Sequence, residues 1–361
     1  MKNDNEKRIR KIIIVCMAIM IISICYLLVH LSINSVLGNI NVEEKIDESE
    51  LEININDNVE EKIDSLHRVL NIMIVGADNL EHEERYSSYA EERSDVLKIL
   101  SLDYTDKEIK LTSVDRDVVV YLPGRKKEYG HFNWAYSYGG SKLAIQTINY
   151  NLDLDVKNYV TFSFAGFIKV IDILGGIDIE LTQKEADAFN DLIRSNAVMN
   201  IHAVEGINHL DGHDALSYAR QRFVDSDFKR MDRQNIVINA VLSKLKESSV
   251  TDLLKIVNDC LPYINTNITI SEIKDLLTDL VEFNLSDIKT YTYPKKQSKD
   301  VCKNPDLLGG YLIRGYSQQV IDLHNFIYEI ENYKPSNVVL NLEKDIYSTF
   351  GEFYENSPLL H

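Results

Sequence analysis

A run of 18 residues without a charged side chain, residues 12–29, constrains this chain more than any other feature. Extended to Ile33, the apolar segment would be about 33 Å long as an α-helix, enough to cross a bilayer. We therefore expect one N-terminal transmembrane helix over residues 12–33. A cleaved signal peptide is the alternative, but the run is longer than the apolar region of most such peptides, and only a weak small-x-small site follows it.

The charges on either side of this run predict the orientation of the chain. Residues 1–11 carry five basic and two acidic side chains, and basic flanks stay on the cytoplasmic side of a membrane. We expect residues 1–11 to form a cytoplasmic tip of a single-pass cell-membrane protein whose remaining chain lies outside. In that compartment Cys260 and Cys302 could pair, although the sequence does not show that they meet.

An acidic segment follows the apolar run. Residues 34–66 hold ten acidic side chains against Lys45 and Lys62, and the sequence of residues 41–47 recurs unchanged at residues 58–64. We interpret this segment as a solvated stalk that holds the folded domain off the membrane. The whole chain has 39 Lys and Arg against 56 Asp and Glu, a net charge of −17. Nucleic acid is therefore not an expected partner.

Strand-like and helix-like segments alternate over residues 67–331, which predicts an α/β fold of the α-β-α sandwich type with a central mixed β-sheet. No Gly-x-Gly-x-x-Gly or Walker motif occurs, so a nucleotide-binding fold has no support. The C-terminal tail, residues 332–361, is left without a role. Strands are expected at residues 68–75, 95–102, 108–114, 118–122, 159–164, 177–181, 288–293 and 336–340, and helices at residues 135–149, 165–174, 182–194, 214–220, 228–245, 271–281 and 318–330.

Arginines gather in one part of this acidic chain. Four of them fall within 14 residues, and Arg93 and Arg116 stand at strand ends. Guanidinium groups bind phosphate oxygens in pairs, which favours an anion site. Surface ion pairs with Asp225, Asp227 and Asp232 are the alternative. The four clustered residues are Arg220, Arg222, Arg230 and Arg233.

The helix phase favours the anion site. In the predicted helix 228–245, the apolar stripe through Val237 and Val241 extends backward onto Gln234 and Arg230. Polar residues on an inward stripe indicate a site or a buried pair, and the helix N-terminus adds attraction for anions. The preceding helix is expected to break near Gln221, so that Arg220 and Arg222 can reach one cavity.

Two carboxylates stand at neighbouring strand ends. Asp78 follows the first strand and Asp95 opens the second. Close to an anion site, they would suit Mg²⁺ with phosphate as a further ligand. Capping of loops is the alternative interpretation of both residues.

Six sequence blocks stand out along the chain, at residues 93–95, 113–117, 133–140, 175–178, 210–222 and 227–234. In this order they resemble the LytR-CpsA-Psr family over about residues 68–295. Members of that family are membrane-anchored enzymes of bacterial envelopes, which transfer wall teichoic acid or capsular polysaccharide from a polyprenyl diphosphate carrier to peptidoglycan. The resemblance implies the same α-β-α sandwich, with the lipid tail in an apolar tunnel.

The resemblance also implies residue roles. Asp78 and Asp95 would hold Mg²⁺ (or Mn²⁺), while Arg93, Asp95, Arg116 and Asp117 would be catalytic. Asp95 or Asp117 would orient or deprotonate the acceptor hydroxyl. The diphosphate would bind to Arg93, Arg116, Arg220, Arg222 and Arg230 with Gln234 beside them, and Arg233 of the cluster joins this set.

Three departures from the family pattern stand out. Asp115 replaces the usual Pro, Lys229 replaces a Gly, and the loop from Asp78 to Arg93 is long and acidic. The expected activity is phosphotransfer outside the cell membrane. A non-catalytic polyprenyl-phosphate sensor, matching the family's older label of transcriptional attenuator, and a polyprenyl diphosphate hydrolase are the alternatives.

Overall fold

The computed structural model describes residues 40–54, 68–77, 94–125, 129–195, 202–220, 227–247, 259, 261–279, 282–283, 288–295, 301–304, 310–330 and 332–356. The predicted cytoplasmic tip and transmembrane helix lie outside these residues, as does Cys260. No helix within these ranges is both long and apolar enough to cross a membrane.

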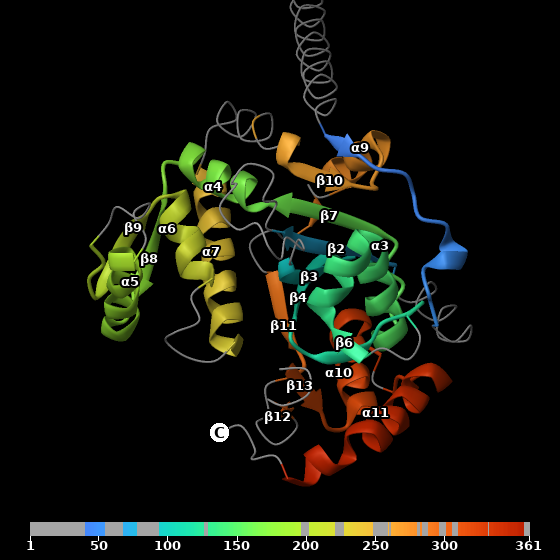
Figure 1. The fold of residues 1–361 in the computed structure, drawn as a ribbon. Coiled ribbons are helices and arrows are strands. Elements are labelled where there is room, and N and C mark those ends of the chain that lie inside the picture. Colours follow the sequence, from blue (N-terminus) through green and yellow to red (C-terminus); the bar gives the residue numbers. More distant parts are fainter. Residues whose placement is uncertain are drawn as a thin grey trace, which may run out of the picture.

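A seven-stranded mixed sheet forms the centre of the fold, which confirms the predicted α/β class (Figure 1). The pairs β1–β10, β7–β2 and β4–β11 are parallel and the other three are antiparallel. In sheet order the strands are β1 (Asn41–Val42), β10 (Ile264–Thr266), β7 (Asn158–Ser163), β2 (Val69–Ala77), β3 (Ser94–Asp103), β4 (Glu108–Val114) and β11 (Ile288–Tyr293).

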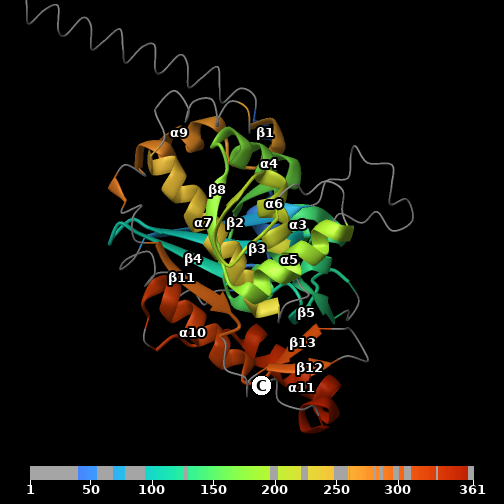
Figure 2. The ribbon, with the colours of Figure 1, turned by 90° about the vertical axis from the view of Figure 1, so that its left-hand side faces the viewer.

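Helices cover both faces of this sheet (Figures 1 and 2). On one face lie α3 (Phe132–Leu152) and α10 (Tyr316–Tyr328), with α11 (Asn337–Asn356) packed against both. The other face carries α4 (Phe164–Ile173), α6 (Gly212–Arg220) and α7 (Asp227–Glu247). The remaining elements are η1 (Glu48–Glu50), η2 (Leu261–Tyr263), α5 (Gln183–Ser195), α9 (Ile270–Asp279), and the strand pairs β5 (Val119–Tyr121) with β6 (Tyr129–His131), β8 (Ile177–Leu181) with β9 (Gly206–Leu210), and β12 (Val301–Asn304) with β13 (Gly310–Ile313).

Strand alternation divides the sheet residues between the two layers. In β2 and β3, the odd-numbered Met73, Val75, Leu97 and Ile99 join the main core beneath α3 and α10. The neighbouring even-numbered residues therefore face the α4–α6–α7 layer. Lys98, which contacts α7, is the most polar of them.

The C-terminal tail differs from its prediction. Residues 336–340, expected as a strand, begin helix α11. The pair Val338-Val339 suggested β-structure, but Val339, Ile346 and Phe350 recur at helical spacing and are buried in the main core. The helix start is fixed by Asp153, whose carboxylate accepts hydrogen bonds from Ser336 N and Oγ at 2.7 and 2.6 Å. Residues of α11 therefore share the main core with residues before position 331.

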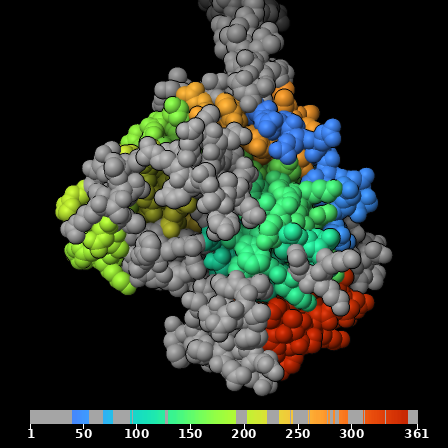
Figure 3. All heavy atoms as spheres, viewed as in Figure 1, coloured from blue at the N-terminus to red at the C-terminus, as the bar shows by residue number. Residues whose placement is uncertain are grey.

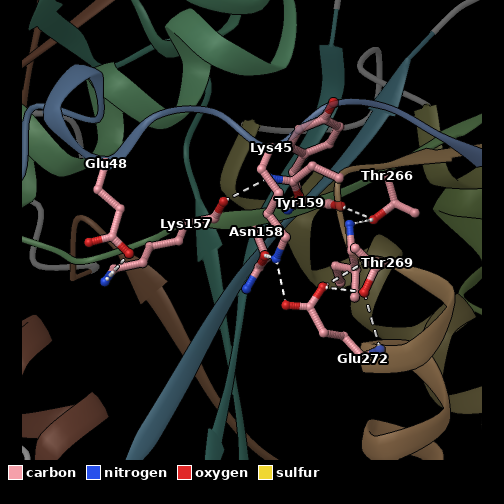
Figure 4. Close-up of polar contacts among 10 residues, drawn as sticks. Lys45, Glu48, Lys157, Asn158, Tyr159, Thr266, Thr269 and Glu272 are labelled. Carbon is pink, nitrogen blue, oxygen red and sulfur yellow. Dashed lines mark hydrogen bonds and ion pairs between the residues drawn. The ribbon is translucent and has the colours of Figure 1, made fainter.

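Residues 40–54 also differ from the expected solvated stalk. They lie along the surface of the domain as a strap that crosses from α9 to α3 (Figures 3 and 4). Lys45 Nζ lies 2.6 Å from Glu272 of α9, and Glu48 lies 2.9 Å from Lys157. Leu51 is fully buried in the main core. The acidic composition suggested a solvated stalk. In the fold, Glu48 and Glu50 pair with Lys157 and Lys142, which lie about 100 residues away in the sequence, and such pairing cannot be predicted from composition.

Candidate functional site

Several predicted site residues lie at one edge of the sheet, which we call the site edge. It consists of Ser163 at the end of β7, Ala77 at the end of β2, Ser94 at the start of β3 and Val114 at the end of β4. Ala77 is paired with both Ser163 and Ser94, and Val114 follows Ser113, the partner of Lys98. The outer two strands of the edge, β7 and β4, are about 14 Å apart at ordinary strand spacing.

Arg116 lies in the turn that follows β4. Its side chain is 6% exposed, and its Nε is 3.5 Å from Oδ1 of Asp117. The turn is closed by two backbone contacts. Asp117 N donates to Asp115 Oδ1 at 3.0 Å, and the first-turn amide of α3, Asn133 N, donates to Arg116 O at 3.3 Å. The buried guanidinium and its neighbouring carboxylate are thus held on a rigid support at the site edge.

Arg220 lies at the opposite end of the site edge. It is the last residue of α6, and its guanidinium carbon is 4.6 Å above the ring of Phe164. Phe164 directly follows β7 and begins α4, where Ser163 caps the helix. The predicted break near Gln221 lies outside the described residues, and the described part of α6 ends at Arg220. The cation–π contact orients the guanidinium of Arg220 at this end of the site edge.

Helix α7 brings Gln234 and Arg233 into the interior. Gln234 is 6% exposed and Arg233 only 2%. Arg233 Nη1 is 4.0 Å from Glu185 of α5, and Val237, one turn further along, belongs to the apolar cluster beneath α5 and α6. Ion pairing was the alternative interpretation of the arginine cluster. Arg233 does lie at ion-pair distance from a carboxylate, and that carboxylate is Glu185 of α5. The side chain of Arg230 is not among those that the structure describes.

Four other predicted residues cannot be placed in the same detail. Asp78, Arg93 and Arg222 lie outside the described residues, and Asp95 is described only through its backbone in β3. Ala77, the neighbour of Asp78 in the chain, is paired with Ser94, the neighbour of Asp95. Among the described side chains, no group of three or more His, Cys, Asp or Glu residues is placed to bind a metal.

An apolar cavity of about 270 Å³ lies directly below the Arg220 end of the site edge. Phe162, which lines it, is two residues before Phe164, the ring that carries Arg220. Its walls come from β7, α4, α7 and the η2–β10 segment, and all are hydrophobic. The lining residues are Val160, Phe162, Gly166, Phe167, Val170, Ile171, Ile238, Val241, Tyr263 and Ile264.

Lys98 is a charged residue that the sequence analysis missed. Its side chain is 2% exposed, and Nζ donates to Ser113 Oγ at 2.7 Å and to Asn235 Oδ1 at 2.8 Å. Burial lowers the pKa of Lys98 to about 7. Strand alternation could have identified it, because Val96, Lys98 and Leu100 share one inward face of a strand without a polar side.

The LytR_cpsA_psr family model matches residues 33–319, most of the chain. The protein belongs to the LytR-CpsA-Psr family. The resemblance carried by the six sequence blocks is thereby confirmed.

Among relatives of this LytR-CpsA-Psr protein is the polyisoprenyl-teichoic acid–peptidoglycan teichoic acid transferase TagV of Bacillus subtilis, which is 35% identical over 50% of this chain and 46% of TagV. The regulatory protein MsrR of Staphylococcus aureus is 30% identical over 66% of this chain and 68% of its own. The chain spans about half the length of the first curated relatives it matches.

Solved structures show the same fold. Protein gbs0355 of Streptococcus agalactiae superposes with a TM-score of 0.62 and 24% identity, covering 81% of this chain and 97% of its own. The crystal structure of Bacillus subtilis TagV superposes with a TM-score of 0.56 and 27% identity, covering 74% and 99% of the two chains. The predicted helix–sheet–helix architecture is therefore that of the LytR-CpsA-Psr family.

Asp115 stands where LytR-CpsA-Psr proteins usually have Pro, and the structure explains how this chain accommodates it. Asp115 N donates to Tyr293 O at 2.8 Å, a hydrogen bond that Pro cannot form. Its side chain accepts from Asp117 N, as an Asx turn does. Two hydrogen bonds thus replace the fixed φ of a proline in holding the turn that carries Arg116.

Proposed function

We propose that this protein is an extracytoplasmic phosphotransferase that moves a glycopolymer from a polyprenyl diphosphate carrier to peptidoglycan. The polymer is of the wall teichoic acid or capsular polysaccharide type. One observation carries the proposal: the site edge holds Arg116 and Arg220, and an apolar cavity lies near its Arg220 end. An anionic head joined to an apolar tail is the ligand chemistry that fits both. The name of TagV, a polyisoprenyl-linked teichoic acid transferase, supports the same substrate class.

The proposed reaction is attack on the sugar-side phosphorus of the donor. A hydroxyl oxygen of the acceptor sugar forms the new P–O bond, and the bond from that phosphorus to the bridging oxygen breaks. Polyprenyl monophosphate leaves with the electron pair. Arg116 and Arg220, with Arg93, Arg222 and Arg230, neutralise the charge that builds on the phosphate oxygens. Asp95 or Asp117 accepts the proton of the hydroxyl.

Asp78 and Asp95 are the residues proposed to hold Mg²⁺. The fit rests on chemistry and backbone placement, since two carboxylates at paired strand ends beside an anion site provide the oxygen ligands that Mg²⁺ prefers. When bound, the ion would neutralise phosphate charge.

Membrane anchoring through residues 12–33 is part of the proposal. It rests on the uncharged run and its basic flank. The anchor would keep the site edge on the side of the membrane where peptidoglycan is found.

A non-catalytic sensor of polyprenyl phosphates is the second candidate, and the name of MsrR, a regulatory protein, favours it. A phosphotransferase converts the lipid-linked donor, whereas a sensor binds it without converting it. The test is incubation of the purified protein with a lipid-linked donor, with and without peptidoglycan, and identification of products by mass. We expect polymer joined to peptidoglycan through a phosphodiester, together with polyprenyl monophosphate.

Each other outcome has a distinct reading. Free polymer phosphate would indicate hydrolysis, and bound but unconverted donor would indicate a sensor. A parallel series with chelator and with Asp95→Asn tests the metal. We expect the variant to need more Mg²⁺ for equal activity, whereas wild-type activity that resists chelator would remove the metal from the proposal.

A further inference from the structure

Lys98 is a buried cation whose partners are neutral. Its two hydrogen-bond acceptors are a serine hydroxyl and an asparagine amide. Within the part of the chain that the structure describes, no carboxylate lies within ion-pair distance of its Nζ. Desolvation alone lowers its pKa to about 7, since no neighbouring negative charge opposes it.

Lys110 of β4 is a second buried lysine and lies on the opposite face of the sheet, against α10. It is as deeply buried as Lys98, yet its Nζ lies 3.0 Å from Glu329, 3.7 Å from Asp103 and 3.8 Å from Glu108. An unpaired buried charge is costly, and Lys110 avoids that cost with three carboxylates. Among the described residues no carboxylate fills this role at Lys98, and its two neutral partners leave its charge able to interact with an anion in the adjoining site.

The position of Lys98 places it next to the site. One row across the sheet runs from Val160 through Ile74 to Lys98 and Ser113, and Val160 lines the apolar cavity. Asn235, which binds Lys98, is one helical turn before Ile238, a second residue of the cavity wall. Along the strands, Lys98 is three residues from Asp95 and Ser113 is three residues from Arg116, about 10 Å in each case.

We propose that Lys98 is an inner positioning residue of the donor site, whose uncompensated positive charge selects lipids that carry phosphate and acts most strongly on the phosphate next to the lipid tail. This inference rests on the proposed function. The arginines lie at the site edge, where the sugar-side phosphate enters, whereas Lys98 lies deeper and on the cavity side. A unit charge at about 10 Å in a protein interior still favours an anion by roughly tenfold in affinity.

The test compares ligands that share one prenyl tail and differ in the charge of the head group. Binding of farnesyl diphosphate, farnesyl monophosphate and farnesol to the full chain is measured for wild type and for Lys98→Met, with inorganic pyrophosphate as the tailless probe. We expect the variant to lose roughly tenfold in affinity for the diphosphate, less for the monophosphate and nothing for farnesol. Its thermal midpoint should stay the same or rise, because an unpaired buried charge has been removed.

Two further variants separate charge from packing. Asn235→Asp gives Lys98 an internal counter-charge and should reduce the preference for phosphorylated tails while the lysine remains. Lys110→Met leaves Asp103 buried without its cation, so it should lower the thermal midpoint and leave the order of affinities for these ligands unchanged.

Three outcomes decide the matter. If wild type prefers phosphorylated tails and Lys98→Met keeps the same preference, the inference is wrong and the proposed function stands. Equal losses for all three tails would make Lys98 a packing residue. A wild-type protein that binds none of the phosphorylated tails would overturn the proposed function itself.

Discussion

Arg220 shows how an aromatic ring can orient a cationic side chain. Its guanidinium rests on Phe164 beside the apolar cavity. We expect Arg220→Ala to weaken donor binding by about 1.5–3 kcal/mol, the range for hydrogen bonds to charged groups. Titration calorimetry with a prenyl diphosphate measures this loss.

Arg68 supplies a matched control for Arg220. It stacks on Tyr104 at 5.1 Å, at the far end of the same strands. Arg68→Ala should leave donor affinity unchanged. If Arg220→Ala instead lowers the thermal midpoint strongly and keeps donor affinity, its role is structural.

Sequence reasoning singled out individual residues through a motif or a helix phase, and their roles stay predictions. Of these residues, the structure places Arg116 and Arg220 at the site edge and buries Gln234 in α7. Sequence reasoning did not separate Arg233, because the partner Glu185 is 48 residues away in the chain and only the fold brings the two together. Lys98 was missed because one lysine in an apolar strand carries no motif.

At the scale of elements, α6 depends on one glycine for its contact with α4. A Cβ at Gly212 would lie 2.4 Å from the carbonyl oxygen of Ile168. Gly212→Ala should therefore push α6 away and displace Arg220 at its other end, with a loss of both stability and donor affinity. Urea unfolding and lipid titration on the same preparation measure the two effects.

Gly351 in α11 is the control for this substitution. The nearest atom to a Cβ there is 3.9 Å away, an ordinary contact. Gly351→Ala should be neutral or stabilise the protein by up to about 1 kcal/mol, since Ala is the better helix former. Equal behaviour of the two variants would contradict the close packing of α6 on α4.

The strap is expected to stabilise the domain mainly through Leu51. This side chain is fully buried in the main core, whereas Val42 in the same strap is 36% exposed. Leu51→Ala should cost about 2–4 kcal/mol in the free energy of unfolding, and Val42→Ala less than about 1 kcal/mol. Chemical denaturation of both variants checks this. Similar costs would mean that the strap is held by its surface ion pairs.

Element prediction followed the strength of local patterns. The strand β4, predicted and observed at residues 108–114, alternates Ile109 and Leu111 with polar residues, and α7 carries an apolar stripe. The prediction for the start of α11 was wrong because two adjacent valines favour a strand locally. The helical spacing of its buried residues becomes visible only over residues 339–350. Short strands such as β10 were missed because three residues hold no period.

At the scale of the whole molecule, acid should loosen the packing of α10 against α3. His324 of α10 is fully buried, with Nε2 2.9 Å from Leu152 O, and burial lowers its pKa to about 4. Between pH 6.5 and 4 the unfolded chain binds a proton at this residue that the folded chain does not. The free energy of unfolding should therefore decrease as the pH is lowered from 6.5 to 4, by on the order of 3 kcal/mol from His324.

The variant His324→Gln isolates this contribution. Its amide can still donate to Leu152, but it does not titrate. We expect a flatter dependence of stability on pH between 6.5 and 4 than in wild type, measured by urea unfolding across that range. Parallel curves for the two proteins would assign the acid sensitivity to carboxylates elsewhere.

The strap also determines how the molecule would carry a mechanical load. Its contacts follow one another along the chain, from the β1–β10 pairing at Asn41 through Lys45 and Glu48 to Leu51 in the core. A pull on the upstream chain along the strap axis would load these contacts first, because they lie between that chain and β2. The strands β1 and β10 form one side of the seven-stranded sheet, so these outer strands would take up the force before it reaches β2, β3 and β4 of the site edge.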